Sequence, residues 1–88
     1  MRSKLMEREV IFFDWIKENS KVLDVGCGTS RLLFELKTKK NCQVTGVDIS
    51  PLVIESLFKA GTDGIVADIQ SDEFSIEDHY DYIIASET

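Results

Sequence analysis

The 88-residue chain has no apolar run that approaches the ~20 residues needed to cross a bilayer as a helix, so no transmembrane segment and no membrane partner is expected. Its first residues are followed by Glu7 and Glu9 rather than by an apolar core, so the sequence predicts no secretory signal. It has only two cysteines, Cys27 and Cys42, which lack the spacing of metal ligands. We therefore expect two reduced thiols, no metal site and a cytoplasmic protein.

Basic residues are absent from the last third of the chain. Residues 61–88 hold eight acidic residues and no Lys or Arg, and the whole chain carries a net charge of -6. Such a surface repels a phosphate backbone, so nucleic acid is not expected as a partner. With 43% hydrophobic and 30% charged residues, the composition is that of an ordinary soluble globular chain. Its length suits one small domain or part of a larger one.

What the sequence does contain is a short glycine turn between an apolar strand and a helical pattern. Residues 22–25 run into Gly26 and Gly28, and a polar pair, Thr29 and Ser30, precedes the helix and can cap it. Glycine accepts a positive φ and has no Cβ, so a ligand can approach the backbone of such a turn closely. The free N–H groups and positive dipole end of the helix point to the same place. The turn is therefore the expected centre of a binding site.

Apolar periodicity and turn residues predict an alternation of strands and helices in a single domain over residues 1–88. An N-terminal helix within residues 1–20 precedes the first strand. Because parallel crossovers are right-handed, the expected order of the strands in the sheet is 3-2-1-4. The predicted segments are a helix at 4–18, strand at 21–26, helix at 30–40, strand at 43–48, helix from Pro51 to a stop at Gly61, strand at 64–68, loop at 70–79 and strand at 80–86.

The same periodicity predicts which residues form the core. In the N-terminal helix, Trp15 is expected in the core together with Phe12 and Phe13. The remaining expected core residues of the helices are Leu32, Leu33 and Leu36 in the second, and Leu52, Val53, Leu57 and Phe58 in the third.

Three carboxylates stand at or near the carboxyl ends of the predicted strands: Asp24, Asp48 and Asp68. Asp48 lies 22 positions after Gly26 and 20 after Gly28, the offset at which a strand-end acid meets the hydroxyls of a bound ribose. The alternative for Asp48 is a turn residue or a helix cap. A carboxylate in a covered strand is costly without a partner. Asp24 therefore makes either a local hydrogen bond to the turn or a contact with a cationic ligand.

The glycine pattern does not match a dinucleotide site. Gly26 and Gly28 fit the first two positions of GxGxxG, but Arg31 occupies the third. That third glycine allows close packing of helix on strand, so its loss counts against NAD. An acidic pocket also disfavours an anionic pyrophosphate. Three strand-end carboxylates instead fit a ligand with a ribose, an adenine amine and a positive charge.

Four stretches resemble the motifs of class I S-adenosylmethionine-dependent methyltransferases. Residues 22–29, which read VLDVGCGT, are similar to the first motif, and residues 44–51, VTGVDISP, to the second. Residues 67–69, ADI, look like the third motif, and residues 80–86, YDYIIAS, look like the fourth. The motifs occur in the right order and at the right spacing. Within the class, the finer pattern is most similar to the MetW-like proteins of methionine biosynthesis.

The resemblance implies an α/β, Rossmann-like three-layer sandwich that binds S-adenosylmethionine and transfers its methyl group to a small-molecule acceptor. Backbone around Gly26, Cys27 and Gly28 would pack against the methionyl part of the cofactor, and Asp24 would face its ammonium group. No catalytic residue is assigned. The other implied contacts are Asp48 with both ribose hydroxyls, Ile49 and Ile69 beside the adenine, Asp68 with the adenine amine, and Ser86 near the reactive methyl group.

The chain departs from this class in its length. Full members have a seven-stranded sheet in about twice as many residues, whereas the pattern here ends after the fourth strand. We therefore expect a partial domain, truncated after strand 4, whose exposed fourth strand is a candidate edge for a homodimer. Two functions stay open. One is the cofactor-binding half of a methyltransferase, and the other is a non-catalytic cofactor-binding or protein-interaction module.

Overall fold

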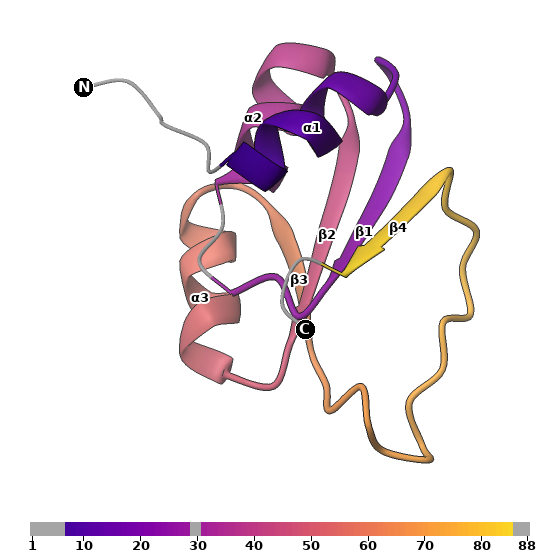
Figure 1. The fold of residues 1–88 in the computed structure, drawn as a ribbon. Helices are drawn as coiled ribbons and strands as arrows, with labels where there is room; N and C mark the ends of the chain where they lie inside the picture. Colours follow the sequence, from indigo (N-terminus) through magenta and orange to yellow (C-terminus); the bar gives the residue numbers. More distant parts are fainter. Residues whose placement is uncertain (1–6, 29–30, 86–88) are drawn as a thin grey trace.

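The computed structural model describes residues 7–28 and 31–85 (Figure 1). Helices and strands alternate as the sequence predicts, although the third and fourth strands are shorter than expected. In chain order the elements are α1 (Glu7–Trp15), β1 (Lys21–Val25), α2 (Leu32–Lys40), β2 (Gln43–Asp48), α3 (Pro51–Lys59), β3 (Asp63–Val66) and β4 (Tyr82–Ala85).

The four strands form one parallel sheet in the order β3-β2-β1-β4, which confirms the predicted order. β1 is central, because Leu23 pairs with Thr45 of β2 on one side and with Ile83 of β4 on the other. The direction of strand addition reverses at β1. In open parallel sheets, ligands bind beyond the carboxyl ends of the strands near such a reversal. The topology therefore indicates where a site is expected before any side chain is considered.

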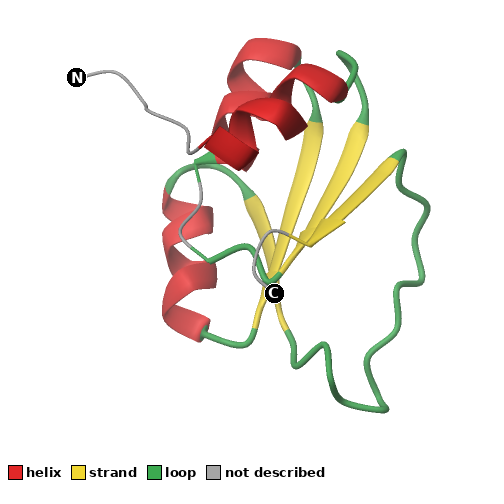
Figure 2. Cartoon of the chain, viewed as in Figure 1, coloured by secondary structure: helices red, strands yellow, loops and turns green. Residues whose placement is uncertain are grey.

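The described helices all cover one face of the sheet (Figures 1 and 2). α2 packs on β2, α3 packs on β2 and β3, and α1 packs against α2. Residues 67–81, here called the crossover segment, connect β3 to β4, and its Phe74 lines a cavity with Leu23 and Val47 of the sheet. The part of the chain that the structure describes thus has two layers of regular structure. The third layer of the expected sandwich is not found in these residues.

The core lies between the helices and the sheet. α2 contributes Leu32, Leu33 and Leu36, which are each at most 1% exposed and confirm the predicted stripe. They belong to one buried cluster with Val22 of β1 and Ile54 of α3. Burying one such aliphatic side chain contributes about 1.5–3 kcal/mol. The α2 stripe is therefore a main source of the stability of the fold.

Gly46 in β2 leaves room for the helices to lie close to the sheet. A Cβ atom at this position would lie 2.6 Å from Leu57 Cδ1, 2.7 Å from Cys27 Sγ and 3.1 Å from Leu33 Cδ1. These separations are shorter than van der Waals contact, so a larger residue would displace its neighbours. Dinucleotide folds obtain close helix–strand packing from the third glycine of the turn. Here Arg31 replaces that glycine, and the room comes from the sheet instead.

The prediction that Trp15 lies in the core is wrong. Trp15 is the last residue of α1 and is 70% exposed, whereas the next residue, Ile16, is only 2% exposed. Phe12 and Phe13 pack against the core as predicted. With Ile16 they define an inner face at three- and four-residue steps, and Trp15 falls beside that face. Lys40 Nζ donates to the carbonyls of Phe13 and Ile16 and satisfies the end of the helix.

The predicted inner face of α3 is also partly wrong. Leu52 and Phe58 are 75% and 57% exposed, and Val53 is half-buried. The buried residues of the helix are Ile54 and Leu57. At 100° per residue, Ile54 and Leu57 lie at the centre of the apolar face of α3, and Val53 and Phe58 lie at its margins. Leu52 falls on the polar side of the helix. The prediction was wrong because it chose apolar residues of the segment as inward-facing without regard to their angular position.

Turn residues begin and end the helices largely as predicted. Ser50 Oγ accepts a hydrogen bond from the N–H three residues later at 3.4 Å, and Pro51 takes the first helical position of α3. Asn41 ends α2 in the left-handed conformation, with φ of 54°. Arg31 occupies the N-cap position of α2 and makes no capping side-chain bond. The predicted caps at residues 29–30 lie outside the described residues.

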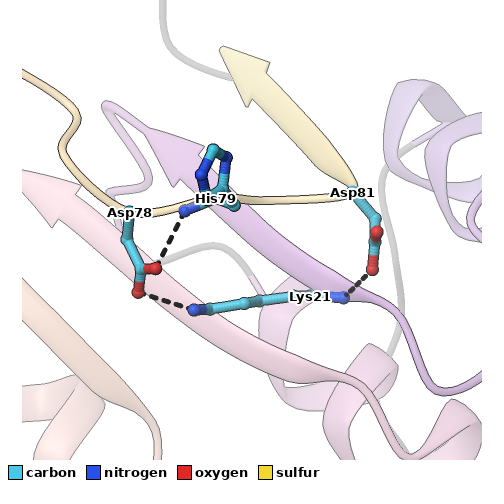
Figure 3. Close-up of polar contacts among 4 residues, drawn as sticks. All are labelled: Lys21, Asp78, His79 and Asp81. Carbon is cyan, nitrogen blue, oxygen red and sulfur yellow. Dashed lines mark hydrogen bonds and ion pairs between the residues drawn. The ribbon is translucent and has the colours of Figure 1, made fainter.

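A group of polar contacts joins the end of the crossover segment to the start of β1 (Figure 3). Lys21 Nζ forms an ion pair with Asp78 Oδ2 at 2.6 Å, and His79 N donates to Asp78 Oδ1 at 2.8 Å. Lys21 N donates to Asp81 Oδ2 at 2.8 Å, and Asp81 N donates to Lys21 O at 2.8 Å. We call these four residues the Lys21 clamp. It lies at the amino ends of the strands, opposite the edge where a ligand is expected.

Candidate functional site

A cleft of about 340 Å³ lies at the carboxyl ends of β1, β2 and β3. This is the edge of the sheet to which the topology points. Two of its lining residues, Ala67 and Gln70, were not among the predicted site residues. Five of the nine predicted site residues complete the lining: Gly26, Asp48, Ile49, Asp68 and Ile69.

The glycine turn after β1 forms one wall of the cleft. Gly26 and Gly28 have φ values of 69° and 56°, in the left-handed region that only glycine adopts at little cost. The N–H groups of Gly26 and Cys27 both donate to Val47 O, at 2.7 and 3.1 Å. The backbone of the turn is therefore bonded to β2, which confirms the predicted sequence of strand and tight turn.

Asp48 ends β2, and its half-buried side chain lines the cleft. Its Oδ2 accepts a hydrogen bond from Gly28 N at 2.9 Å, and its Oδ1 accepts one from Ser50 N at 3.0 Å. An ionised carboxylate offers about four acceptor positions, two on each oxygen. One position on each oxygen of Asp48 is therefore left for a ligand. Two neighbouring hydroxyl groups would use both.

The opposite wall of the cleft combines one carboxylate with apolar surface. Asp68 lies two residues beyond β3 and not within the strand, because β3 ends at Val66. Its Oδ1 accepts a hydrogen bond from Gln70 N at 3.0 Å, a local turn contact that leaves the exposed carboxylate other acceptor positions. Ile49 and Ile69 are 65% and 40% exposed. Together these groups offer apolar contacts to a flat ring and acceptors to an amine at its edge.

Asp24 lies inside the fold and does not line the cleft. Its exposed fraction is 0%. Among the described residues, every buried side-chain nitrogen or oxygen has a hydrogen-bond partner, so this carboxylate is accommodated within the chain. The predicted contact of Asp24 with an ammonium group stays a prediction.

Cys27 contributes its backbone to the turn and its side chain to the core. The side chain is 2% exposed. Burial, together with the carboxylates of Asp24 and Asp48, raises the pKa of the Cys27 thiol to about 12. The thiol is therefore neutral near pH 7 and is a poor nucleophile. Cys27 and Cys42 are both free, as the sequence predicts.

Two further predicted residues are placed differently from the rest. Gly28 borders a separate cavity of about 200 Å³, lined by residues of α2 and α3, although its N–H bonds to Asp48. Ser86 lies outside the described residues.

Over residues 7–28 and 31–85, no three His, Cys, Asp or Glu side chains are grouped so as to hold a metal ion. In the same ranges, no helix combines the length and the apolar character that a membrane crossing needs.

Sequence reasoning assigned no role to three positions that the structure shows to matter, two near the cleft and one at the opposite edge of the sheet. Gly46 gives the helices room, and a glycine inside a strand pattern is a known signal of close approach. Ala67 N donates to Asp48 O at 3.0 Å, and this bond holds the start of the crossover segment against the end of β2. Lys21 holds the far end of the crossover segment, 57 and 60 positions from its partners Asp78 and Asp81, so no local pattern could indicate it.

An open parallel sheet with a glycine turn after one central strand and a carboxylate at the end of the next defines a nucleotide-binding α/β domain. A family model described as a methyltransferase domain matches residues 16–88. The chain belongs to this methyltransferase domain family.

Individual relatives agree with the family. N-methyltransferase 4 of Papaver somniferum is 35% identical over an alignment of 80 positions that covers 82% of this chain and 22% of that protein. The crystal structure of coclaurine N-methyltransferase bound to N-methylheliamine and SAH is similar with a TM-score of 0.70 and 26% identity, over 97% of this chain and 29% of that chain. A TehB-like SAM-dependent methyltransferase from Corynebacterium glutamicum has a TM-score of 0.79 at 24% identity, over 97% of this chain and 46% of that chain.

The last likeness, at 24% identity, shows the fold alone. It confirms the Rossmann-like α/β class that the sequence predicts. The chain spans less than half of the length of each of these three proteins.

Proposed function

We propose that this chain is the S-adenosylmethionine-binding part of a methyltransferase. The observation that carries the proposal is the Asp48 carboxylate, which lines the cleft beside the glycine turn and keeps one acceptor position on each oxygen for a ribose diol. Membership of the methyltransferase domain family supports it. So do the SAH-bound structures of coclaurine N-methyltransferase and of the plantazolicin methyltransferase BpumL, which are 26% and 25% identical to this chain.

The walls of the cleft suit the remaining parts of this cofactor. Ile49 and Ile69 offer apolar surface to an adenine ring, and Asp68 offers hydrogen-bond acceptors to the amine of that ring. The turn at Gly26 approaches the methionyl part without a side chain in the way. A contact of Asp24 with the ammonium group, directly or through water, stays a prediction, because the carboxylate is 0% exposed and does not line the cleft. Ser86 near the reactive methyl group stays a prediction.

The described residues bind and orient the cofactor, and they leave the chemistry to it. When bound, S-adenosylmethionine supplies a methyl group on a positively charged sulfur, ready for in-line displacement. Such a reaction depends on positioning and exclusion of water more than on an acid or a base. The carboxylates of Asp48 and Asp68 also complement the positive charge of the cofactor.

The acceptor that we propose is a small molecule. In its support, the coclaurine N-methyltransferase structure contains N-methylheliamine. A cytoplasmic location and a homodimer through β4 belong to the same proposal. β4 is an edge strand of the described sheet, and an unpaired edge is a template for another chain.

The second candidate function is a non-catalytic cofactor-binding or protein-interaction module. This candidate concerns the 88 residues by themselves, which cover between 22% and 46% of the three relatives described above. Binding without turnover distinguishes this candidate from a complete enzyme.

Calorimetric titration of the chain with S-adenosylhomocysteine tests the proposed site. We expect binding by the wild type, no measurable binding by Asp48→Ala, and unchanged binding by Asp72→Ala. The last variant removes the same charge from an exposed position away from the cleft lining. A folded wild-type chain that binds S-adenosylhomocysteine no better than it binds NAD contradicts the proposal. A methyl-transfer assay with the same chain then separates the two candidate functions.

A further inference from the structure

Three loops converge on the last two residues of β2. Val47 O accepts hydrogen bonds from Gly26 N and Cys27 N of the glycine turn. The Asp48 carboxylate accepts from Gly28 N and from Ser50 N at the start of α3, and Asp48 O accepts from Ala67 N beyond β3. The backbone bonds of Val47 and Asp48 would persist with any side chain. Only the bonds of Gly28 and Ser50 depend on a carboxylate.

The geometry points to a positioning role for Asp48 that exists before any ligand binds. Each carboxylate oxygen commits one lone pair to the protein, Oδ2 to Gly28 and Oδ1 to Ser50. These two bonds fix the rotation of the carboxylate and hold the glycine turn at a set distance from the first turn of α3. The second lone pair of each oxygen stays free for one hydroxyl of a vicinal diol. Ligand binding then adds hydrogen bonds without breaking any, which is the meaning of a preorganised site.

The two bonds explain why a carboxylate is required and an amide is not equivalent. Both partners of Asp48 are backbone N–H donors, 20 residues before and 2 residues after it in the chain. An asparagine can present its oxygen to only one of them. Its NH2 group would then face the other donor, and one N–H would lose its acceptor. Asp48→Asn therefore detaches either the glycine turn or the start of α3, even though it keeps the size of the side chain.

Asp68 provides the matched control within the same cleft. Its carboxylate also accepts a backbone hydrogen bond, from Gln70 N at 3.0 Å, but that partner is only two residues away. Asp68 thus stabilises its own turn and touches no second loop through the bonds of its side chain. Asp68→Asn removes the same charge from the same cleft and leaves Gly28 and Ser50 bonded.

Amide hydrogen exchange of the ligand-free 88-residue chain, measured residue by residue by NMR, tests the positioning role. In Asp48→Asn, we expect the Gly28 or the Ser50 amide to exchange on the order of tenfold faster or more, the factor for a lost hydrogen bond to a charged acceptor. The Leu23 amide, in the centre of the sheet, should change no more than global stability changes. In Asp68→Asn, the amides of Gly28 and Ser50 should exchange as in the wild type. Unchanged exchange at both amides in Asp48→Asn overturns the proposal, and so does an equal increase at Leu23.

A second measurement keeps the proposal testable if Asp48→Asn does not fold. In the wild-type chain, a through-hydrogen-bond scalar coupling between Gly28 N and Asp48 Cγ is expected, and its absence overturns the proposal. Only the use of the free lone pairs by a diol rests on the proposed function. Exchange is measured without any ligand. If Asp48→Asn loses protection at Gly28 and the wild-type chain does not bind S-adenosylhomocysteine, the positioning role is supported and the proposed function is contradicted. If the wild-type chain binds and Asp48→Asn keeps its protection at Gly28 and Ser50, the proposed function is supported and the positioning role is contradicted.

Discussion

The two edges of the sheet use the same residue type, aspartate, in opposite ways. At the carboxyl edge, Asp48 and Asp68 accept hydrogen bonds from backbone N–H groups only, and they keep free acceptor positions that face a cleft. At the amino edge, Asp78 and Asp81 are bound to Lys21 through its ammonium group and its backbone. A carboxylate paired with a cation has its charge neutralised. A carboxylate held by neutral N–H groups keeps its charge available to a ligand. Asp81 is also held by a neutral N–H, that of Lys21, so it is the ion pair of Asp78 that distinguishes the fastening edge from the binding edge.

A change in the middle of the sheet should have the largest effect, because it disturbs the packing of the helices on β2. We expect Gly46→Ala to lower the free energy of unfolding by about 3 kcal/mol, since its Cβ would lie 2.6 Å from Leu57 Cδ1 and 2.7 Å from Cys27 Sγ. Urea unfolding followed by far-ultraviolet circular dichroism measures the loss. Gly64→Ala is the control, because its Cβ would come no closer than 3.0 Å to a neighbour. Equal losses in the two variants contradict the close packing at Gly46.

The next largest effect should appear at the carboxyl edge alone. We expect Asp68→Ala to weaken S-adenosylhomocysteine binding about tenfold, the value of one hydrogen bond of about 1.4 kcal/mol to the adenine amine. Its unfolding free energy should change little, because Asp68 is exposed and bonds only to its own turn. Calorimetric titration gives the affinity. Asp81→Ala, at the other edge, should bind as the wild type does, and a shared loss of affinity would break the division between the edges.

A smaller effect on stability is expected at the amino edge. Asp81→Ala removes the acceptor of Lys21 N at 2.8 Å and should lower the free energy of unfolding by about 1 kcal/mol. The reciprocal bond from Asp81 N to Lys21 O is made by the backbone and remains. Thermal unfolding at pH 7 detects the change. Glu77→Ala, a nearby exposed acid outside the clamp, should melt with the wild type.

The smallest effect should come from the exposed ion pair, and it should depend on pH. The hydrogen bond from Lys21 lowers the pKa of Asp78 below 3.8, and the bond to Asp78 raises the pKa of Lys21 above 10.5. The lowered carboxyl pKa adds stability above pH 3.8 that is lost as the pH falls through the lower folded value. The raised ammonium pKa adds stability below pH 10.5 that is lost as the pH rises through the higher folded value.

Melting temperatures of the wild type and Asp78→Asn should therefore differ most between pH 4 and pH 10 and converge outside that window. High salt should shrink the difference, because the pair is open to solvent. A difference that is constant from pH 2 to pH 12 would show that the ion pair is not its cause.

The binding edge was easier to predict from the sequence than the fastening edge, for a physical reason. Gly26 and Gly28 need positive φ, and Asp48 follows them at a fixed offset, so local chemistry encodes the turn and the acid. The clamp joins Lys21 to acids 57 and 60 positions later. Only the folded crossover segment brings these groups together, so no periodicity or motif in the sequence predicts their contact.

The errors in the core have a different cause. In α2, the buried leucines lie on one side of the helix, and they were predicted correctly. In α3 the prediction counted apolar residues as inward-facing without regard to their angular position, although Leu52 falls on the polar side of the helix and Phe58 at the margin of its apolar face. Trp15 stands at the end of α1, where one further residue, Ile16, takes the buried position. An apolar residue of a helix is therefore expected to be buried only when its angular position lies within the apolar face.

The central place of β1 also has a consequence for how the chain is made. Leu23 pairs with Ile83, a residue that leaves the ribosome 60 positions later. At about 5–20 residues per second, synthesis takes roughly 3–12 seconds to cover that distance. During this interval one side of an apolar strand waits without its partner, while β2 can already pair with the other side. The nascent chain therefore carries one unpaired edge of β1 until β4 emerges, and this edge is open to wrong associations during the interval.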